Sequence, residues 1–346
     1  MTAPAMESTV AALLAFGKGI LAADESLPTI GKRFGALNIP STAENRRAYR
    51  ELLFTTPELG EFISGAILFD ETIHQKAANG QILPEILIRQ GIVPGIKVDG
   101  GTMALPNFDG EKITQGLDGL RERFSAYREL GARFTKWRAV LAIGRGLPTA
   151  TCIEANARSL ALFAALSQEA GLVPIVEPEV LMDGSHTLAQ CEEVTSDTLK
   201  TVFAALFDHR VALETMLLKT GMVLPGMDCP QQAEVGKVAE ATLGCLRRTV
   251  PAAIPGIVFL SGGQRDVAAT ERLNAICQDG GVPWKLSFSF GRALQDAALK
   301  TWHGSPVNVA AAQAALHHRA KCNHLALQGE YTELAELEGK ASKAAL

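Results

Sequence analysis

Residues 172–180 read LVPIVEPEV, an almost uninterrupted apolar run that carries two glutamates near its end, Glu177 and Glu179. Runs that do not alternate between apolar and polar residues suit strands buried on both faces, as in parallel sheets. Residues two apart in a strand point to the same side, so both carboxylates are expected on one side and Pro178 on the other. The stretch therefore predicts a buried parallel strand that ends in acidic side chains.

Seven further apolar runs share this character. They lie at 19–23, 63–69, 92–98, 133–137, 215–223, 256–261 and 284–290. Helical spacing is found between them, at 42–55, 116–130, 152–170, 196–210, 232–249, 266–278, 292–301 and 307–328. Eight strands that alternate with helices predict the α/β class and a single (β/α)8 TIM barrel over residues 1–328. Residues 329–346 are expected to form a polar, partly mobile C-terminal tail, and a doubly wound open sheet is the alternative fold.

Two helix starts are expected from capping boxes. Ser41 with Glu44 has the required spacing ahead of the 42–55 segment, and Thr151 with Glu154 has it ahead of 152–170.

The composition narrows the functional classes. A net charge of −4 argues against a general polyanion binder, so no nucleic-acid partner is expected. No apolar run approaches the roughly 18 residues of a membrane helix, so no membrane association is expected. The six cysteines are scattered without a C-x-x-C pair, which favours reduced thiols and a cytoplasmic location. Zinc-ligand spacings, P-loops and Rossmann glycine motifs do not occur, so neither a metal nor a cofactor is expected.

Charged residues gather where the predicted strands end, and in a barrel these ends surround the active site. They are Asp24, Lys97, Lys136, Arg138, Glu177, Glu179, Lys219 and Arg292. Buried charges must pair, shift their pKa or face water, because burying them alone is costly. A lysine amine made neutral by nearby cations and desolvation attacks ketones and aldehydes. Spacing leaves open whether Lys97, Lys136 or Lys219 is that amine, and Lys219 is the best single choice because its approach is the most apolar.

Two groups of residues suggest phosphate binding. Ser261, Gly262 and Gly263 follow the seventh run, and Gly291 with Arg292 follows the eighth run and opens a helix. Barrels often hold phosphate there, on backbone N–H groups and a helix N-terminus. The other group follows the first run, across the predicted mouth, and contains Ser26, Thr29, Lys32 and Arg33. If both groups bind phosphate, the substrate is an extended sugar bisphosphate, and the reaction concerns a carbon–carbon bond.

Nine segments resemble class I fructose-bisphosphate aldolases. They are GKGILAADES (17–26), ENRRAYRELLFT (44–55), GAILFDETIHQK (65–76), GIKVD (95–99), TQGLDGLRERFSAYRELGARFTKWR (114–138), IVEPEVLMDG (175–184), LLKTGMVLPG (217–226), RRTVPAAIPGIVFLSGGQ (247–264) and SFSFGRALQ (287–295). The resemblance implies a metal-free barrel that cleaves fructose 1,6-bisphosphate reversibly through a lysine Schiff base. The products are dihydroxyacetone phosphate and glyceraldehyde 3-phosphate, in glycolysis and gluconeogenesis. It also implies a homo-oligomer, commonly a tetramer.

The resemblance implies a role for each catalytic candidate. Lys219 matches the imine-forming lysine, and Glu177 matches the acid/base that forms and dehydrates the carbinolamine. Asp24 and Lys136 match the pair that contacts the C4 hydroxyl and the reacting carbons, and Glu179 matches a supporting charged position, as does Arg138.

The same resemblance assigns the phosphates. Ser261, Gly262 and Arg292 match the C1-phosphate site, whereas the C6-phosphate side matches Ser26, Thr29, Lys32, Arg33 and Lys97.

Animal-type members of the family end in a tyrosine that assists a proton transfer. The last tyrosine of this sequence, Tyr331, does not occupy that terminal position. The alternatives are another Schiff-base barrel, such as a transaldolase or a deoxyribose-phosphate lyase, and a barrel kept as a binding scaffold.

Overall fold

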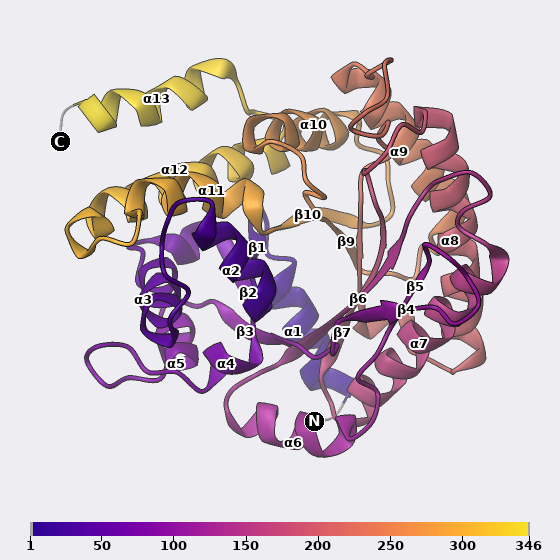
Figure 1. Ribbon diagram of the computed structural model, residues 1–346, viewed down its shortest axis with the longest axis horizontal. Helices are drawn as coiled ribbons and strands as arrows, with labels where there is room; N and C mark the ends of the chain where they lie inside the picture. Colours follow the sequence, from indigo (N-terminus) through magenta and orange to yellow (C-terminus); the bar gives the residue numbers. More distant parts are fainter. Residues whose placement is uncertain (1–2, 345–346) are drawn as a thin grey trace.

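The computed structural model describes residues 3–344, and its main feature is a closed barrel of eight parallel strands (Figure 1). The strands are β1 (Gly19–Ala23), β2 (Ile63–Leu68), β3 (Val93–Lys97), β6 (Phe134–Leu141), β7 (Val173–Val180), β8 (Leu217–Thr220), β9 (Gly256–Phe259) and β10 (Lys285–Phe290). Their order around the barrel is β1-β10-β9-β8-β7-β6-β3-β2, so the first strand pairs with the last. Each predicted apolar run contributes one strand. The predicted TIM barrel is confirmed, and the open sheet is wrong.

Eight helices correspond to the predicted helical intervals and surround the strands in Figure 1. They are α3 (Ala43–Phe54), α6 (Leu120–Glu129), α7 (Ala150–Glu169), α8 (Leu188–Asp208), α9 (Val235–Thr249), α10 (Asp266–Asp279), α11 (Arg292–Trp302) and α12 (Val309–Leu327). Their apolar faces cover the outer side of the barrel. Trp137 of β6, for example, stacks on Phe163 of α7 with ring centroids 5.6 Å apart.

The helix starts differ from the predicted capping boxes. Helix α3 is capped by Thr42, whose hydroxyl accepts from the amide of Asn45, and α7 is capped in the same way by Thr149. Helix α8 begins well before residue 196, because Thr187 and Gln190 form a reciprocal capping box there. Neighbouring Ser and Thr residues compete for the cap, and spacing alone does not decide between them.

Several elements lie outside the predicted pattern. The additional helices are α1 (Ala3–Leu13), α2 (Leu27–Gly35), α4 (Asp70–Ile73), α5 (Leu83–Arg89) and α13 (Glu333–Ala344), with short 3-10 turns at Leu59–Glu61, Leu213–Thr215 and Pro306–Asn308. An antiparallel hairpin of β4 (Thr102–Ala104) and β5 (Lys112–Thr114) interrupts the connection from β3 to α6. No helix within residues 3–344 has the length and apolarity needed to cross a bilayer.

Helix α1 closes the amino-terminal end of the barrel. Its residues Met6, Val10 and Leu13 belong to one buried cluster with side chains from the barrel interior, among them Phe134 and Leu217. Glycines allow this close approach, since a Cβ atom on Gly65 would lie 2.6 Å from Leu13 Cδ2. The floor of the barrel is therefore apolar and filled, and the polar site lies at the opposite end.

The segment after α12 contains more structure than a polar tail. Helix α13 lies at the periphery beside α12 (Figure 1), where Glu336 pairs with the buried Arg319, Nη1 to Oε1 being 2.5 Å. The Tyr331 hydroxyl donates to the same carboxylate at 2.8 Å. Residues 345 and 346 lie outside the described residues, and the boundary at residue 328 stays a prediction.

Candidate active site

A cavity lies at the carboxyl ends of the strands. Its lining comprises Ala22, Asp24, Glu25, Ser26, Thr29, Arg33, Lys97, Lys136, Arg138, Glu177, Glu179, Lys219, Leu260, Ser261, Gly262, Ser289, Gly291 and Arg292. Among these residues six are cationic and four are acidic, whereas the whole chain has a net charge of −4. The local surplus of positive charge favours an anionic ligand at this mouth.

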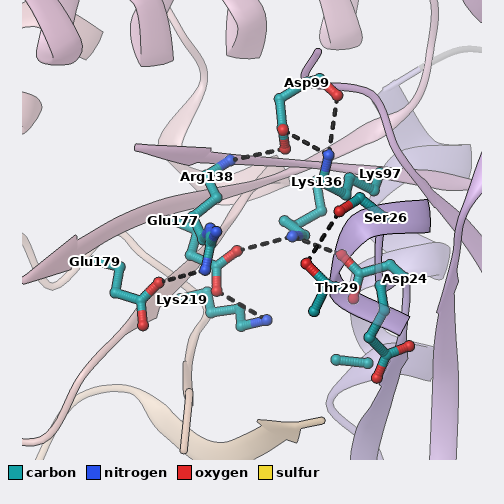
Figure 2. Close-up of polar contacts among 12 residues, drawn as sticks. Asp24, Ser26, Thr29, Lys97, Asp99, Lys136, Arg138, Glu177, Glu179 and Lys219 are labelled. Carbon is teal, nitrogen blue, oxygen red and sulfur yellow. Dashed lines mark hydrogen bonds and ion pairs between the residues drawn. The ribbon is translucent and has the colours of Figure 1, made fainter. Parts of the chain in front are cut away.

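The centre of the cavity is a chain of buried ion pairs (Figure 2). Lys136 Nζ lies 2.6 Å from Asp24 Oδ2 and 3.1 Å from Glu177 Oε2. The other oxygen of Glu177, Oε1, lies 3.0 Å from Lys219 Nζ. Lys136, Glu177 and Lys219 each expose only 4% of the side chain, so their interactions are only weakly screened by water.

The strand register explains this convergence. Arg138 of β6 pairs with Glu177 of β7, and Lys97 of β3 pairs with Lys136 of β6. Side chains alternate along a strand, so Lys136 and Arg138 face the cavity while Trp137 faces the helices. The predicted sharing of one side by Lys136 and Arg138, and by Glu177 and Glu179, is confirmed by their place in the cavity lining.

The ion pairs govern the acidity of the central carboxyls. Burial alone would raise the pKa of Asp24 and of Glu177, but the ammonium groups of Lys136 and Lys219 outweigh this and hold both pKa values below their ordinary range. For Lys136, burial opposes the charge, yet the carboxylates of Asp24 and Glu177 raise its pKa. Asp24 and Glu177 are therefore ionised at neutral pH, and Lys136 is a fixed cation between them.

Glu179 differs from Glu177 although it stands on the same strand face. Burial, reinforced by the nearby charge of Glu177, raises its pKa, against the opposing effect of Arg138. Arg138 Nη1 lies 2.9 Å from Glu179 Oε2 (Figure 2). Two carboxyls with opposite pKa shifts thus line one cavity, as is common at sites of acid–base chemistry.

A glycine turn after β9 exposes backbone donors. Gln264 N donates to Ser261 O at 2.8 Å, which closes a turn in which Gly262 and Gly263 have φ of +54° and +98°. Such positive φ values favour glycine. Within residues 3–344 no group accepts a hydrogen bond from the backbone amides of Ser261, Gly262 and Gly263. Successive free amides of this kind form anion-binding concavities.

The two groups of residues predicted to bind phosphate lie next to each other rather than on opposite sides of the mouth. A Cβ atom on Gly263 would lie 3.1 Å from Arg292 Nη2, and one on Gly291 would lie 3.9 Å from Arg33 Nη2. The prediction that the second group lies across the mouth is wrong, because β1 pairs with β10 in the closed barrel.

The segment after β1 is helix α2, not a loop. Ser26 occupies its N-cap and Pro28 its first turn, and the Ser26 and Thr29 hydroxyl oxygens lie 3.0 Å apart (Figure 2). Consecutive helical residues point about 100° apart, so Arg33 reaches the cavity, whereas Lys32 is exposed and does not line it. Lys97 lines the cavity and pairs with Asp99 at 2.6 Å.

Four lining residues escaped prediction: Ala22, Glu25, Leu260 and Ser289. Glu25 pairs with Arg33 at 2.5 Å and with the buried Arg50 at 2.6 Å. Its signal was its place directly after Asp24 at a strand end. Ser289 has a buried hydroxyl without a hydrogen-bond partner among the described residues, and nothing in its apolar run distinguished it from a core position.

Comparison with known proteins agrees with this geometry. The family model "Fructose-bisphosphate aldolase class-I" matches residues 5–346. The Dictyostelium discoideum fructose-bisphosphate aldolase is 52% identical over 97% of this chain and 95% of its own length. A cytosolic aldolase of Arabidopsis thaliana, isozyme 4, is also 52% identical, over 94% of this chain and 84% of its own.

A solved structure extends the similarity to three dimensions. The fructose-bisphosphate aldolase of Plasmodium falciparum, in a complex with TRAP and a small-molecule inhibitor, superposes with a TM-score of 0.94. It is 49% identical and covers 95% of both chains. From the barrel, the charged cavity and these likenesses together, we conclude that the chain belongs to the class-I fructose-bisphosphate aldolase family.

Proposed function

We propose that this cavity cleaves fructose 1,6-bisphosphate through a Schiff base on Lys219. Family membership provides the reaction: reversible carbon–carbon cleavage by a lysine Schiff base in glycolysis. One observation supports the choice of lysine. Lys219 is 3% exposed, lines the cavity and has its Nζ 3.0 Å from Glu177 Oε1, so an acid–base group stands within reach of the reacting nitrogen.

Formation of the imine needs a neutral amine and a proton carrier. Lys219 attacks the C2 ketone, which forms a carbinolamine with a new C–N bond. The ionised Glu177 takes one proton from Lys219 to free the amine and a second after the C–N bond forms, and it passes both to the C2 oxygen, which leaves as water. An iminium ion then remains on Lys219. The iminium then serves as the electron sink for cleavage.

Cleavage requires removal of the C4 hydroxyl proton. Asp24 and Glu177 are the candidate bases, because both are ionised and both contact Lys136. The C3–C4 electron pair moves onto the iminium and glyceraldehyde 3-phosphate departs. Lys136 stabilises the negative charge that develops near C4. Protonation and hydrolysis of the remaining enamine release dihydroxyacetone phosphate and restore Lys219.

Binding of the two substrate phosphates positions the reacting carbons beside Lys219. We assign the C1 phosphate to the amides of Ser261 and Gly262, with Arg292 as the charged partner. The C6 phosphate is assigned to the side formed by Ser26, Thr29, Arg33 and Lys97. Fixing both ends converts the attack on C2 into an intramolecular event.

We also propose a cytoplasmic location and a homotetramer. Relatives in Arabidopsis thaliana and Pisum sativum are described as cytosolic or cytoplasmic, which supports the first proposal. Sedimentation velocity tests the second, for which the expected mass is four times the 36.8 kDa of one chain.

Borohydride trapping tests the residue assignment. Incubation with dihydroxyacetone phosphate and borohydride should label the peptide that contains Lys219, and Lys219→Met should abolish both labelling and cleavage. Lys237→Met is the matched control, because Lys237 is an exposed lysine paired with Glu240 outside the cavity. Label on another lysine, or none on the wild type, would contradict the assignment. Comparing cleavage of fructose 1,6-bisphosphate with that of single-phosphate sugars separates this function from other Schiff-base barrels.

A further inference from the structure

The glycine turn after β9 is supported from behind by helix α10. Arg272 Nη1 donates to Gln264 Oε1 at 2.8 Å, and Gln264 is the last residue of the turn. Gln264 is 6% exposed, so its side chain is part of the protein interior rather than of the cavity surface. Its Nε2 also contacts Met222 Sδ, at 3.7 Å, three residues after Lys219. Gln264 therefore joins α10, the turn and the segment that follows β8.

The turn needs such support because of its composition. Gly262 and Gly263 adopt positive φ values, and glycine visits many other conformations at nearly equal cost. Among the described residues, a single backbone hydrogen bond, from Gln264 N to Ser261 O, closes the turn. A further contact that fixes Gln264 therefore limits the arrangements in which the free amides of the turn face one point.

Helix α10 is itself held on another side. Thr270 accepts from Arg319 Nη2 at 2.6 Å and donates to Asn323 Oδ1 at 2.9 Å, both on α12. Thr270 and Arg272 are two residues apart on a helix and so point about 200° apart. Arg272 consequently extends toward the turn from a helix that is anchored on its far face.

The position of Arg272 lacks a simpler explanation. Its guanidinium is half-buried, and within residues 3–344 its Nε atom has no hydrogen-bond partner. Burial lowers the pKa of Arg272, against the opposing effect of Glu271. In the described part of the chain, the one side-chain hydrogen bond of Arg272 goes to Gln264.

We propose that Gln264 and Arg272 are positioning residues that hold the Ser261–Gly263 turn in its phosphate-binding conformation. This inference rests on the proposed function, because it takes the turn to bind the C1 phosphate. The pair touches neither the substrate nor the reacting atoms. It acts on affinity for C1-phosphorylated ketoses, while the chemistry at Lys219 proceeds as before.

A double-mutant cycle tests the pair. Arg272→Met and Gln264→Leu should each raise KM for fructose 1,6-bisphosphate about tenfold and change kcat by less than about twofold. The KM for fructose 1-phosphate should rise by the same factor, since both substrates carry the C1 phosphate. The double variant should be no worse than either single variant, because residues that act as one unit are not additive. Arg272→Lys keeps a donor and should restore KM to within about threefold of the wild type.

The controls separate this inference from the proposed function. Arg248→Met removes an ion pair with Glu192 on the outer helices and should leave KM unchanged. Thermal melting establishes that each variant is folded; if Arg272→Met is not, Gln264→Leu and Arg272→Lys decide the question. Unchanged KM in folded variants, additive effects, or a loss confined to kcat would overturn the inference. Failure of the wild-type chain to cleave or to be trapped would instead overturn the proposed function.

Discussion

Lys136 and Lys219 share one carboxylate. They stand on β6 and β8, on either side of β7, and the two oxygens of Glu177 are divided between them at 3.1 and 3.0 Å. A proton gained or lost by Glu177 therefore changes the charge beside the candidate nucleophile and beside the cation near C4 at the same moment. This coupling allows one glutamate to serve more than one proton transfer in a cycle.

Lys136→Met should be strongly destabilising. The substitution leaves the carboxylates of Asp24 and Glu177 with less compensation in a buried site, and breaking a buried pair typically costs about 3–5 kcal/mol. Chemical denaturation should show this loss in the free energy of unfolding. The double variant Lys136→Met with Asp24→Asn should recover part of it, because one of the stranded charges is removed. A Lys136→Met variant as stable as the wild type would contradict the expected coupling.

The loss of stability at acid pH should depend on the carboxyl groups of Asp24 and Glu177. The pKa values of Asp24 and Glu177 are lower in the folded chain than their ordinary values of 3.8 and 4.5. Their contribution is therefore complete above those ordinary values and declines as the pH falls below them. The free energy of unfolding should decrease from about pH 5 to about pH 2. Asp24→Asn should flatten this slope, and an identical slope for wild type and variant would argue against the ion pair.

Arg292→Ala should weaken substrate binding more than chemistry. A hydrogen bond to a charged group contributes about 1.5–3 kcal/mol, which corresponds to a decrease in kcat/KM of roughly tenfold to a hundredfold. Most of this change should fall on KM in steady-state assays. Arg292→Lys keeps the charge without the planar fork of the guanidinium, so its kcat/KM should lie between those of the wild type and of Arg292→Ala. A fall in kcat at constant KM would place Arg292 in the chemical step instead.

Excess chelator should leave cleavage unchanged. Asp24, Glu177 and Glu179 are each paired with a lysine or arginine, so side-chain cations already neutralise the carboxylates of the cavity. Activity measured before and after prolonged treatment with EDTA checks this expectation. Loss of activity that returns with added divalent metal would favour a metal mechanism.

The barrel could be predicted because its strands stand out in the sequence as continuous apolar runs. The eight apolar runs are mostly buried on both faces, so periodicity alone located them, and the charged residues at the ends of six runs located the site. Closure followed from the number of strands. That the two groups of phosphate-binding residues are adjacent could be seen only from the barrel order, in which β1 and β10, the strands that precede Arg33 and Arg292, are neighbours.

Other features depend on contacts that are distant in sequence. Helix α2 begins at Leu27 with a proline in its first turn, and it lies outside the predicted helical intervals. Met6 and Val10 have unremarkable neighbours in the sequence, and their burial depends on barrel residues far along the chain. Gln264 and Arg272 carry no motif, and their pairing is visible only once α10 is packed behind the turn.

The plug formed by α1 bears on the order of assembly. Its apolar side chains are synthesised before the barrel strands, yet Leu217 and Val258, which belong to the same cluster, lie far along the chain and are made much later. Until then the amphipathic first segment lacks its native partners and is a natural target for chaperones. The interior of the barrel is thus completed when α1 meets strands that lie far along the chain, so deleting residues 3–13 should impair maturation of a catalytic mouth that they do not line.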